Sequence, residues 1–375
     1  MAEGNRPTQR HYQLLIVGGG PAGLMTAISA ARKGVDSILL VEKRREWGLP
    51  VQCAEAVPKL ISLVARIPRQ AVAHRIGHIA LHLDGKPIGS LRTPGFVIHR
   101  EILERHLAHR AAKRGVELLQ PARVTEVGER EATLDTGETT VRITADIIAG
   151  ADGPRSLVRK SMGLPAPLLM RALQHTLPLA QPIEDVEIYF AHGYGAGYAW
   201  CFPKGDTANV GLALDPSEPA RSLRTLFEDF VSFLKRRGKV AEGEPIRRTG
   251  GLIPASGPVL SSVKANRLLV GDAAGLTDPL TGAGIHAAVA SGQFAGEAIA
   301  AALREDDLSQ LQGYEQEWRD LLETFLAEDL RARTRLAQCD EADYPDALRE
   351  AWRLHKPKSR LRPASLFLRR LRRHV

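Results

Sequence analysis

The pattern of hydrophobic and polar positions predicts alternating strands and helices at the start of the chain. Residues 12–17 are apolar and lead directly into three glycines, which indicates a buried strand that enters a turn. Residues 21–33, rich in Ala, Leu and Ile and followed by Gly34, predict a helix, and residues 37–41 predict a second buried strand. A strand, a helix and a strand in this order indicate a parallel βαβ unit and therefore an α/β sheet.

The rest of the chain continues this mixture. Residues 101–114 and 284–303 predict helices, and the chain from residue 307 onward has a helical pattern rich in Leu and Arg. Residues 164–250 contain strand-like patches with many Pro and Gly residues and few long helices. Short strands are expected at residues 116–119, 123–126, 132–134 and 140–143, and buried strands at residues 145–149 and 266–270.

We therefore predict an α/β fold (α+β overall) with a Rossmann-type nucleotide-binding domain built from separate segments. These segments are residues 10–60, 91–160 and 251–305. Residues 61–90 and 161–250 are expected to form an inserted β-rich domain that binds the substrate. Residues 306–375 are expected to form a C-terminal helical region with a basic tail.

Composition excludes several classes of protein. The 375 residues are enough for two or three lobes. No apolar run reaches the ~18 residues of a membrane-spanning helix, and the polar start lacks the apolar stretch of a secretory signal. Cys53, Cys201 and Cys339 lie far apart, so neither a disulfide framework nor a metal site is expected. A reducing, cytoplasmic location follows as the prediction.

The formal net charge of +8 is concentrated at one end of the chain. Residues 350–375 hold nine Lys and Arg and one acidic residue, and the rest of the chain has 42 of each sign. Arginines alternate there with Leu366, Phe367, Leu368 and Leu371, as in a basic amphipathic helix that lies on an anionic membrane. We expect peripheral contact with such a membrane, a solvated tail being the alternative. Nucleic acid is not an expected partner, because the excess charge is local, and no oligomeric state is predicted.

A glycine motif at the end of the first strand predicts dinucleotide binding. Gly18 permits the tight turn, Gly20 lets the backbone approach a pyrophosphate, and Gly23 lets helix and strand pack closely. Glu42 follows at the end of the second strand, where a carboxylate can accept hydrogen bonds from a ribose. The alternative is a structural turn beside a surface glutamate.

A second glycine cluster, residues 193–197, does not predict another dinucleotide site. Its spacing differs, and a strand-like segment follows it instead of a helix. With one dinucleotide site and no separate nicotinamide domain, FAD is favoured over NAD as the cofactor.

A third signal lies near the long predicted helix. The buried strand at residues 266–270 leads into Gly271 and Asp272, and Pro279, Gly282, Ala283 and Gly284 follow before the helix begins near Ile285. An aspartate at a strand end can hold a polyol hydroxyl group. A helix N-terminus can stabilise negative charge near the N1 and C2 oxygen of a flavin.

These motifs and several further segments resemble those of known protein families. The glycine motif, the segment Ala151-Asp152-Gly153 and the pair Gly271-Asp272 resemble the three fingerprints of the FAD-dependent aromatic-hydroxylase superfamily. Residues 42–44, residues 48–55, the segment YAWCFPKG at 198–205 and residues 208–211 are similar to the geranylgeranyl reductase family. The resemblance covers residues 10–305. The chain departs from the family pattern at Ala54 and Ala56, where glycine is expected.

The resemblance implies an FAD-binding domain of the aromatic-hydroxylase type and an enzyme that saturates C=C bonds of isoprenoid chains. Electrons would come from NADPH or ferredoxin, and the substrate would be a hydrophobic prenyl chain on a lipid or a diphosphate. The implied cofactor-binding residues are Gly18, Gly20, Ala22, Gly23, Glu42, Lys43, Arg100, Val124, Asp152, Gly153, Gly271, Asp272, Pro279, Gly282, Ala283, Gly284 and Ile285.

The chemistry of such an alkene suggests the remaining residues. Proton addition gives a tertiary cation, which hydride from N5 of reduced flavin can quench, so the site needs an apolar cavity and a proton source. Cys53 is a candidate proton donor, a redox switch or a buried structural thiol, and Glu55 either orients Cys53 or closes its loop. The strand-like run of Tyr198, Trp200, Phe202 and Pro203 is expected to line the substrate cavity, because alternate residues of a strand face one side.

Two other functions fit the same motifs. A flavin monooxygenase or halogenase would share the scaffold, but halogenases carry a W-x-W-x-I-P segment where this chain has Tyr198 and Phe202. A non-catalytic protein that binds a prenyl chain would keep the cavity without needing Cys53.

Overall fold

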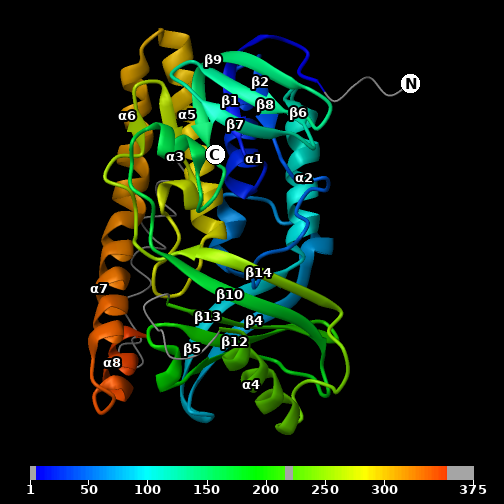
Figure 1. The fold of residues 1–375 in the computed structure, drawn as a ribbon, viewed down its shortest axis with the longest axis vertical. Coiled ribbons are helices and arrows are strands. Elements are labelled where there is room, and N and C mark those ends of the chain that lie inside the picture. The colour runs from blue at the N-terminus through cyan, green and yellow to red at the C-terminus, as the bar shows by residue number, and fades with distance from the viewer. Residues whose placement is uncertain (1–5, 216–222, 353–375) are drawn as a thin grey trace.

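The computed structural model describes residues 6–215 and 223–352. Two β-sheets lie one above the other along the longest axis, each with its own helices (Figure 1). Apolar clusters of buried residues fill the first half and both faces of the sheet in the second half. Within the described residues, no helix has the length and apolar character needed to cross a membrane.

The first sheet is the predicted nucleotide-binding sheet. Its central strand β1 (His11–Val17) pairs in parallel with β2 (Ile38–Val41) and with β9 (Thr140–Gly150). Every residue of β2 is buried, as expected of a parallel strand covered on both faces. Its other strands are β6 (Glu117–Leu119), β7 (Arg123–Val127), β8 (Glu131–Asp135), β15 (Val263–Lys264) and β16 (Arg267–Leu269).

One strand replaces two that were expected. The predicted strands at residues 140–143 and 145–149 are both part of β9. Burial alternates along its first half, where β9 pairs antiparallel with β8, and becomes continuous where it pairs in parallel with β1 and β16. The change of hydrophobic pattern therefore marks a change of neighbours and not the end of a strand.

Several helices of the described chain pack in this half of the molecule. They are α1 (Pro21–Arg32), α2 (Arg100–Ala112), α3 (Leu157–Ser161) and α5 (Ile285–Glu305). Helices α1 and α5 cross closely, because Gly292 and Gly296 of α5 lie directly against α1 and a side chain at either position would overlap it. This crossing places the N-termini of both helices at the same end of the sheet (Figure 1).

The second sheet is mostly antiparallel. In spatial order its strands are β14 (Arg247–Pro254), β10 (Leu169–Pro178), β13 (Thr207–Leu214), β12 (Tyr198–Lys204), β11 (Val186–Phe190), β4 (Val72–Leu83), β5 (Lys86–Ile98) and β3 (Ala56–Pro58). This sheet extends beyond residues 61–90 and 161–250: it includes residues 56–58 and runs on to residues 98 and 254.

The far face of the second sheet is covered by a helix that the sequence analysis did not predict. Helix α4 (Leu223–Arg236) buries Leu226, Phe227, Phe230 and Leu234 against the outward side chains of β12 and β13. Residues 164–250 are rich in Pro and Gly and contain strand-like patches. This local composition did not indicate an amphipathic helix.

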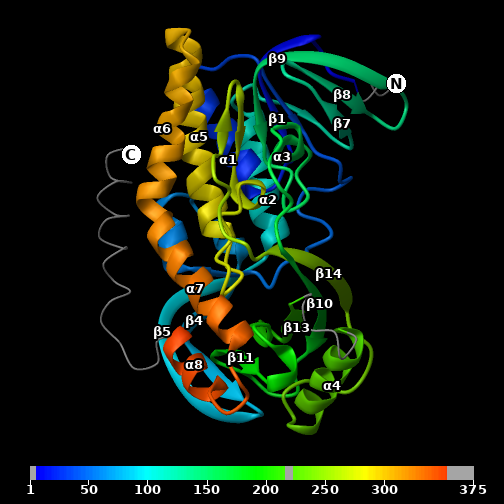
Figure 2. The same cartoon turned by 60° about the vertical axis from the view of Figure 1, so that its left-hand side comes forward.

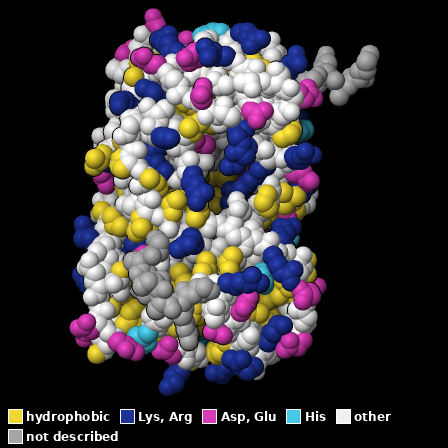
Figure 3. Space-filling model, in the orientation of Figure 1, with side chains coloured by type: hydrophobic (Ala, Val, Ile, Leu, Met, Phe, Trp, Pro, Cys, Tyr) yellow, Lys and Arg dark blue, Asp and Glu magenta, His cyan; other side chains and the backbone are white. Residues whose placement is uncertain are grey.

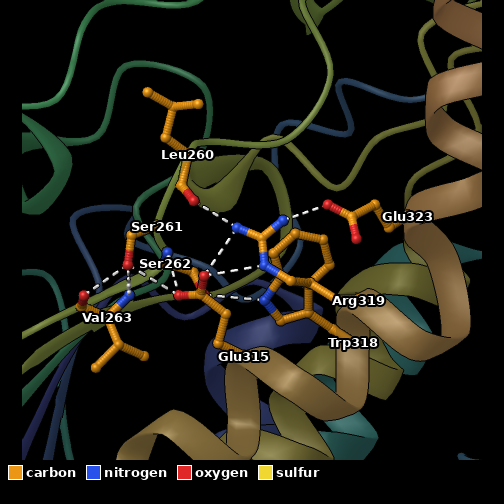
Figure 4. A network of polar contacts seen from close by, with 8 residues as sticks. All are labelled: Leu260, Ser261, Ser262, Val263, Glu315, Trp318, Arg319 and Glu323. Atoms are coloured by element: carbon orange, nitrogen blue, oxygen red, sulfur yellow. Dashed lines mark hydrogen bonds and ion pairs between the residues drawn. The ribbon is translucent and has the colours of Figure 1, made fainter.

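The C-terminal helices connect the two halves, as Figures 1 and 2 show. They are α6 (Leu311–Trp318), a π-helical turn (Arg319–Glu323), α7 (Thr324–Gln338) and α8 (Tyr344–Ala351). Figure 4 shows how α6 is anchored to the loop before β15: Glu315 accepts hydrogen bonds from Ser261 and Ser262, and Arg319 lies between Glu315, Glu323 and the carbonyl of Leu260. The predicted basic tail lies almost entirely outside the described residues.

Candidate active site

A cavity of about 390 Å³ lies where the two halves meet. Its walls come from the loops of the first sheet, from residues 52–58 and from the inward face of the second sheet. On the face drawn in Figure 3, the molecule is hollowed midway along its long axis, and hydrophobic side chains there lie between Lys and Arg side chains.

The glycine loop between β1 and α1 forms one end of the cavity. Gly18 has a positive φ of 106°, and a side chain there would overlap the backbone of Ala151. A side chain at Gly23 would overlap the carbonyl of Gly18, so Gly23 allows α1 to pack against the loop. Gly20 differs, because a Cβ atom there would meet nothing within 4 Å, and Gly20 and Ala22 line the cavity. The backbone at Gly20 is thus open to a ligand.

Glu42 lies beside this loop. Its carboxylate accepts hydrogen bonds from the backbone N–H of Gly19 at 2.7 Å and of Arg44 at 2.8 Å. The N–H of Ala122 donates to the backbone carbonyl of Glu42 at 2.8 Å, which brings the start of β7 next to β2. Glu42, Lys43 and Val124, three of the predicted cofactor-binding residues, are not part of the cavity lining.

Asp152 holds the start of α3 beside the same loop. One carboxylate oxygen, Oδ2, accepts a hydrogen bond from the N–H of Leu157 at 2.6 Å. The other, Oδ1, is buried without a partner in the described chain. Burial raises the pKa of this carboxyl, although the hydrogen bonds from Ser156 and Leu157 oppose the shift. Ala151 and Gly153, on either side of Asp152, line the cavity.

The predicted motif at residues 271–285 forms the next part of the wall. Asp272 lines the cavity, and its Oδ1 accepts a hydrogen bond from the hydroxyl of Thr277 at 2.6 Å. Gly282, Ala283, Gly284 and Ile285 also line it, whereas Gly271 packs against Ala22 and Ala288, and Pro279 is not part of the lining. Helix α5 begins here with Gly284 as its N-cap and without a side-chain cap.

These features fit the predicted FAD. An open backbone at Gly20 and two helix N-termini without side-chain caps lie along one cavity, and Asp152, with its unpartnered buried oxygen, lies between two residues of its lining. Free N–H groups at helix N-termini favour phosphates and negative charge. The first sheet thus offers room and hydrogen-bonding groups for a dinucleotide that extends from Gly20 toward Ile285.

The loop that carries Cys53 is held by the second sheet. The backbone carbonyls of three successive residues accept hydrogen bonds: Cys53 from Gln174 Nε2 at 3.0 Å, Ala54 from Asn209 Nδ2 at 3.2 Å, and Glu55 from the N–H of Ile98 at 2.9 Å. The loop is therefore an ordered part of the cavity wall.

Glu55 is buried at the centre of this arrangement. Its Oε2 accepts hydrogen bonds from Lys204 Nζ at 2.5 Å and Asn209 Nδ2 at 2.9 Å, and its Oε1 accepts one from the N–H of Arg100 at 2.8 Å. Its backbone has a positive φ of 70°, which is uncommon for a residue other than glycine. The bonds to Lys204, Asn209 and Arg100 compensate the cost of the buried charge and of this conformation.

Cys53 is placed so that its sulfur stays protonated. Burial raises the pKa of the thiol, and the nearby Arg100 guanidinium opposes this shift. The N–H of Glu55 donates to Sγ at 3.2 Å. Arg100 itself is held by Glu104, whose Oε1 accepts a hydrogen bond from Nε at 2.5 Å. Burial alone would lower the pKa of Arg100, but the carboxylate of Glu104, together with Cys53 and Asp272, outweighs it and raises that pKa.

The aromatic residues of β12 form the opposite wall. Tyr198, Trp200 and Phe202 share the inward face of the strand and line the cavity, whereas Pro203 is buried outside the lining. Trp200 Nε1 donates to Gln174 Oε1 at 3.0 Å, and the Tyr198 hydroxyl donates to the carbonyl of Thr281. Burial raises the pKa of Tyr198, so its hydroxyl remains protonated.

The far part of the cavity is apolar. Trp352, at the end of α8, packs edge-on against Phe190 with ring centroids 5.2 Å apart and against Tyr198 at 5.9 Å. Aliphatic residues complete this part of the wall: Ile76, Ile79, Leu91, Val186 and Ile188.

Polar residues of this site that the sequence prediction did not include are Gln174, Lys204, Asn209 and His286. Lys204 and Asn209 lie within the segments 198–205 and 208–211 that carried the family resemblance, so those segments could have indicated them. Gln174 is in an ordinary strand and His286 in an ordinary helix, and no local pattern distinguishes either residue.

Comparisons with known proteins agree with this geometry. The model of a family described as FAD binding domain matches residues 11–50 and 90–328. A digeranylgeranylglycerophospholipid reductase of Methanococcus vannielii is 31% identical over 353 residues, 90% of this chain and 89% of its own. A geranylgeranyl bacteriochlorophyll reductase-like protein of Thermoplasma acidophilum is similar in structure, with a TM-score of 0.82, 26% identity and 90% of each chain covered. The p-nitrophenol 4-monooxygenase of Pseudomonas putida, 19% identical over 96% of this chain and 98% of its own with a TM-score of 0.74, shares the fold.

The open position at Gly20 gives a test of cofactor binding that is separate from folding. The backbone there (φ −74°, ψ −177°) is accessible to any residue, so Gly20→Val should fold normally while filling the space over the loop. We expect its affinity for FAD, measured by fluorescence titration, to fall by at least about tenfold, or about 1.4 kcal/mol. Gly193→Val, at a position equally open but outside the cavity lining, should keep normal affinity. Unchanged affinity in Gly20→Val would show that this loop does not hold the cofactor.

The buried pair of Lys204 and Glu55 gives a second test. Lys204→Met leaves the Glu55 carboxylate buried without its cation, so the free energy of unfolding should fall by about 3 kcal/mol, measured by urea denaturation. The double variant Glu55→Gln/Lys204→Met should recover most of this loss. Lys239→Met is the matched control, because Lys239 pairs with Glu187 at 2.6 Å but its side chain is 24% exposed, against 7% for Lys204. A double variant as unstable as Lys204→Met would contradict this account.

Proposed function

The chain belongs to the geranylgeranyl reductase family of FAD-dependent oxidoreductases, and on this premise we propose that it saturates C=C bonds of geranylgeranyl or related isoprenoid chains carried on a lipid or a diphosphate. The observation that supports this most is the joining of three elements in one cavity. A protonated thiol, an apolar and aromatic wall, and the loops that suit FAD all line it. The relative from Methanococcus vannielii is named for action on a digeranylgeranyl phospholipid, which is a substrate of this class.

Bound FAD, once reduced, supplies hydride. The side chains of the cavity supply the proton, bind the isoprenoid chain and exclude water. An isoprenoid double bond is electron-rich and does not accept hydride until a proton has been added, so the enzyme needs an acid next to the chain. Cys53 is that acid in our proposal: burial keeps the thiol protonated at neutral pH, and the hydrogen bond from the N–H of Glu55 stabilises the thiolate that remains.

The aromatic wall has two roles in the proposal. Tyr198, Trp200 and Phe202 provide an apolar surface for the isoprenoid chain, and they exclude water that would otherwise capture a carbocation. The faces of aromatic rings also attract positive charge, which favours the tertiary cation formed by proton addition.

Glu55 acts as a positioning residue. Both of its carboxylate oxygens accept hydrogen bonds from protein groups, so it holds the loop of Cys53 against β12, β13 and the start of α2. Arg100, beside Cys53 and within the electrostatic reach of Asp272, is positioned to bind the cofactor. For the remaining predicted cofactor-binding residues, we propose the contacts with FAD that the sequence motifs imply.

Three further points complete the proposal. The electron donor is NADPH or ferredoxin, the enzyme acts in the cytoplasm, and the basic tail at residues 350–375 brings it to an anionic membrane that contains its substrate. A peripheral location suits an enzyme whose prenyl substrate is a component of the lipid phase.

The test is an anaerobic assay. The FAD-loaded protein is reduced with dithionite and mixed with a geranylgeranyl lipid or geranylgeranyl diphosphate, and the product is analysed by mass spectrometry. We expect a gain of two hydrogens per double bond together with reoxidation of the flavin. Flavin that stays reduced, with no mass gain from either compound, would reject the proposal for these substrates. Incorporation of oxygen into the substrate in air would then support the monooxygenase alternative.

Cys53→Ser tests the proton donor. We expect the rate of alkene reduction to fall at least about 100-fold, the range that loss of a general acid produces, with FAD affinity unchanged. In the unaltered enzyme this rate should be constant through neutral pH and should decrease only as pH rises through the raised pKa of the thiol. Cys201→Ser is the control, because Cys201 lies on the opposite face of β12. Wild-type rates in Cys53→Ser would assign the proton to another group.

A further inference from the structure

His286 is a titratable residue of the cavity for which the proposed reaction has no role. It is the second residue of α5 and lines the cavity with Asp278, Thr281 and Gly282. In the described parts of the chain no group donates a hydrogen bond to its imidazole or accepts one from it. The residue is half-buried, and its side chain is part of the cavity wall.

The His286 nitrogens remain accessible, because neither is among the buried polar atoms that lack a partner in the described chain. A neutral imidazole has one donor and one acceptor nitrogen, so both can bond to a group in the cavity. Most of the other polar side chains in the cavity already have protein partners: Glu55 has Lys204 and Asn209, Asp272 has Thr277, and Gln174 has Trp200. His286 is therefore available to a ligand in the cavity.

The chemistry of the two ligands indicates which one it contacts. An isoprenoid chain has no hydrogen-bond acceptor other than its weakly basic double bonds. A flavin ring has nitrogen and oxygen acceptors along one edge, and reduction adds negative charge there. The first residues of α5, whose N-terminus favours negative charge, form the cavity wall next to His286.

The charges around His286 allow its protonation state to change when negative charge is added to the flavin on reduction. Burial lowers the pKa of His286, and the Asp278 carboxylate opposes this shift. Asp278 also accepts hydrogen bonds from the N–H groups of Leu280 and Thr281, at 2.9 and 3.0 Å, which hold it in place. The imidazole is therefore neutral near pH 7 until another negative charge reaches it.

We propose that His286 is a catalytic residue that contacts the bound flavin and takes up a proton from solvent each time the flavin is reduced. The inference rests on the proposed function. On reduction, the donor (a reduced nicotinamide or ferredoxin) supplies two electrons, the flavin takes up one proton, and His286 takes up a second. When a double bond is saturated, the flavin returns a hydride, Cys53 gives its proton to the alkene, and His286 returns its proton to the Cys53 sulfur. The product gains two hydrogens, and the charges on flavin and imidazole cancel.

This arrangement stores both protons and both electrons for one double bond before the reaction begins. No proton then has to cross the apolar wall while a carbocation is present.

The number of protons taken up can be measured without turnover. The midpoint potential of the FAD-loaded full-length protein is determined with redox dyes at several values between about pH 7 and pH 8.5, above the ordinary pKa of a histidine. The slope gives the protons bound per two electrons. We expect two for the unaltered protein and one for His286→Gln, which keeps an N–H donor but cannot take up a proton.

His106→Gln is the matched control. His106 is also on a helix and also half-buried, and its pKa is also lowered with burial as the largest cause, but it lies outside the cavity lining. We expect two protons for this variant. One proton for the unaltered protein, or two for His286→Gln, would overturn the inference.

A second measurement applies if His286→Gln does not bind FAD. Nitrogen-15 NMR of labelled histidines in the unaltered protein should show one ring that changes from neutral to protonated on reduction at constant pH, and no such ring would reject the proposal. Failure of the proposed function is distinguishable, since it appears as a lack of FAD binding or of prenyl saturation. A protein that saturates the alkene while binding one proton per two electrons contradicts only the role of His286.

Discussion

The burial of the Glu55 carboxylate is the interaction on which the geometry of the cavity depends. A carboxylate with almost no solvent exposure is tolerated only when charged and polar donors surround it. Here those donors come from three separate elements: Lys204 at the end of β12, Asn209 in β13 and the N–H of Arg100 at the start of α2. The hydrogen bonds that stabilise the Glu55 carboxylate also hold the loop of Cys53. Compensation of the buried charge and positioning of the thiol therefore depend on the same contacts.

The cavity exists because the second sheet meets the first at this loop. One face of β12 contributes Tyr198, Trp200 and Phe202 to the cavity, while its other face packs on α4. The C-terminal helices extend from the first half to the second and bring Trp352 against Phe190 (Figure 2). Anchoring of α6 through Glu315 and Arg319 to the loop before β15 fixes the start of this connection, next to the strand that leads to Asp272.

The same low-polarity surroundings shift several titrating groups toward their neutral forms. The Cys53 thiol, the Tyr198 hydroxyl and the His286 imidazole all lie in the cavity wall, and burial is the largest cause of the pKa shift of each. A reaction through a carbocation needs such a wall, because water or an anionic side chain would capture the cation. Arg100, Glu55 and Asp278 are charged residues that modulate these groups, and each is itself held by hydrogen bonds.

The sequence by itself determined the parts of this protein that depend on local pattern. The buried strands β1 and β2, the glycine loop with Gly18 and Gly23, and the alternation of Tyr198, Trp200 and Phe202 each follow from a short periodic or steric requirement. Two local patterns were misleading. The hydrophobic pattern of β9 changes within one continuous strand, and α4 lies in a segment whose Pro and Gly content did not indicate a helix.

Only the tertiary structure decided which distant residues share a surface. Gln174 bonds to the carbonyl of Cys53, 121 positions away, and Lys204 meets Glu55 across 149. His286 reaches the cavity wall from the start of α5, and within the described residues its imidazole has no hydrogen-bond partner. Such pairings result from how two sheets pack, a long-range outcome that carries no periodic signal along the chain. Sequence motifs could therefore indicate that Cys53 and Glu55 belong to a site, but the groups that hold or face them had to come from the fold.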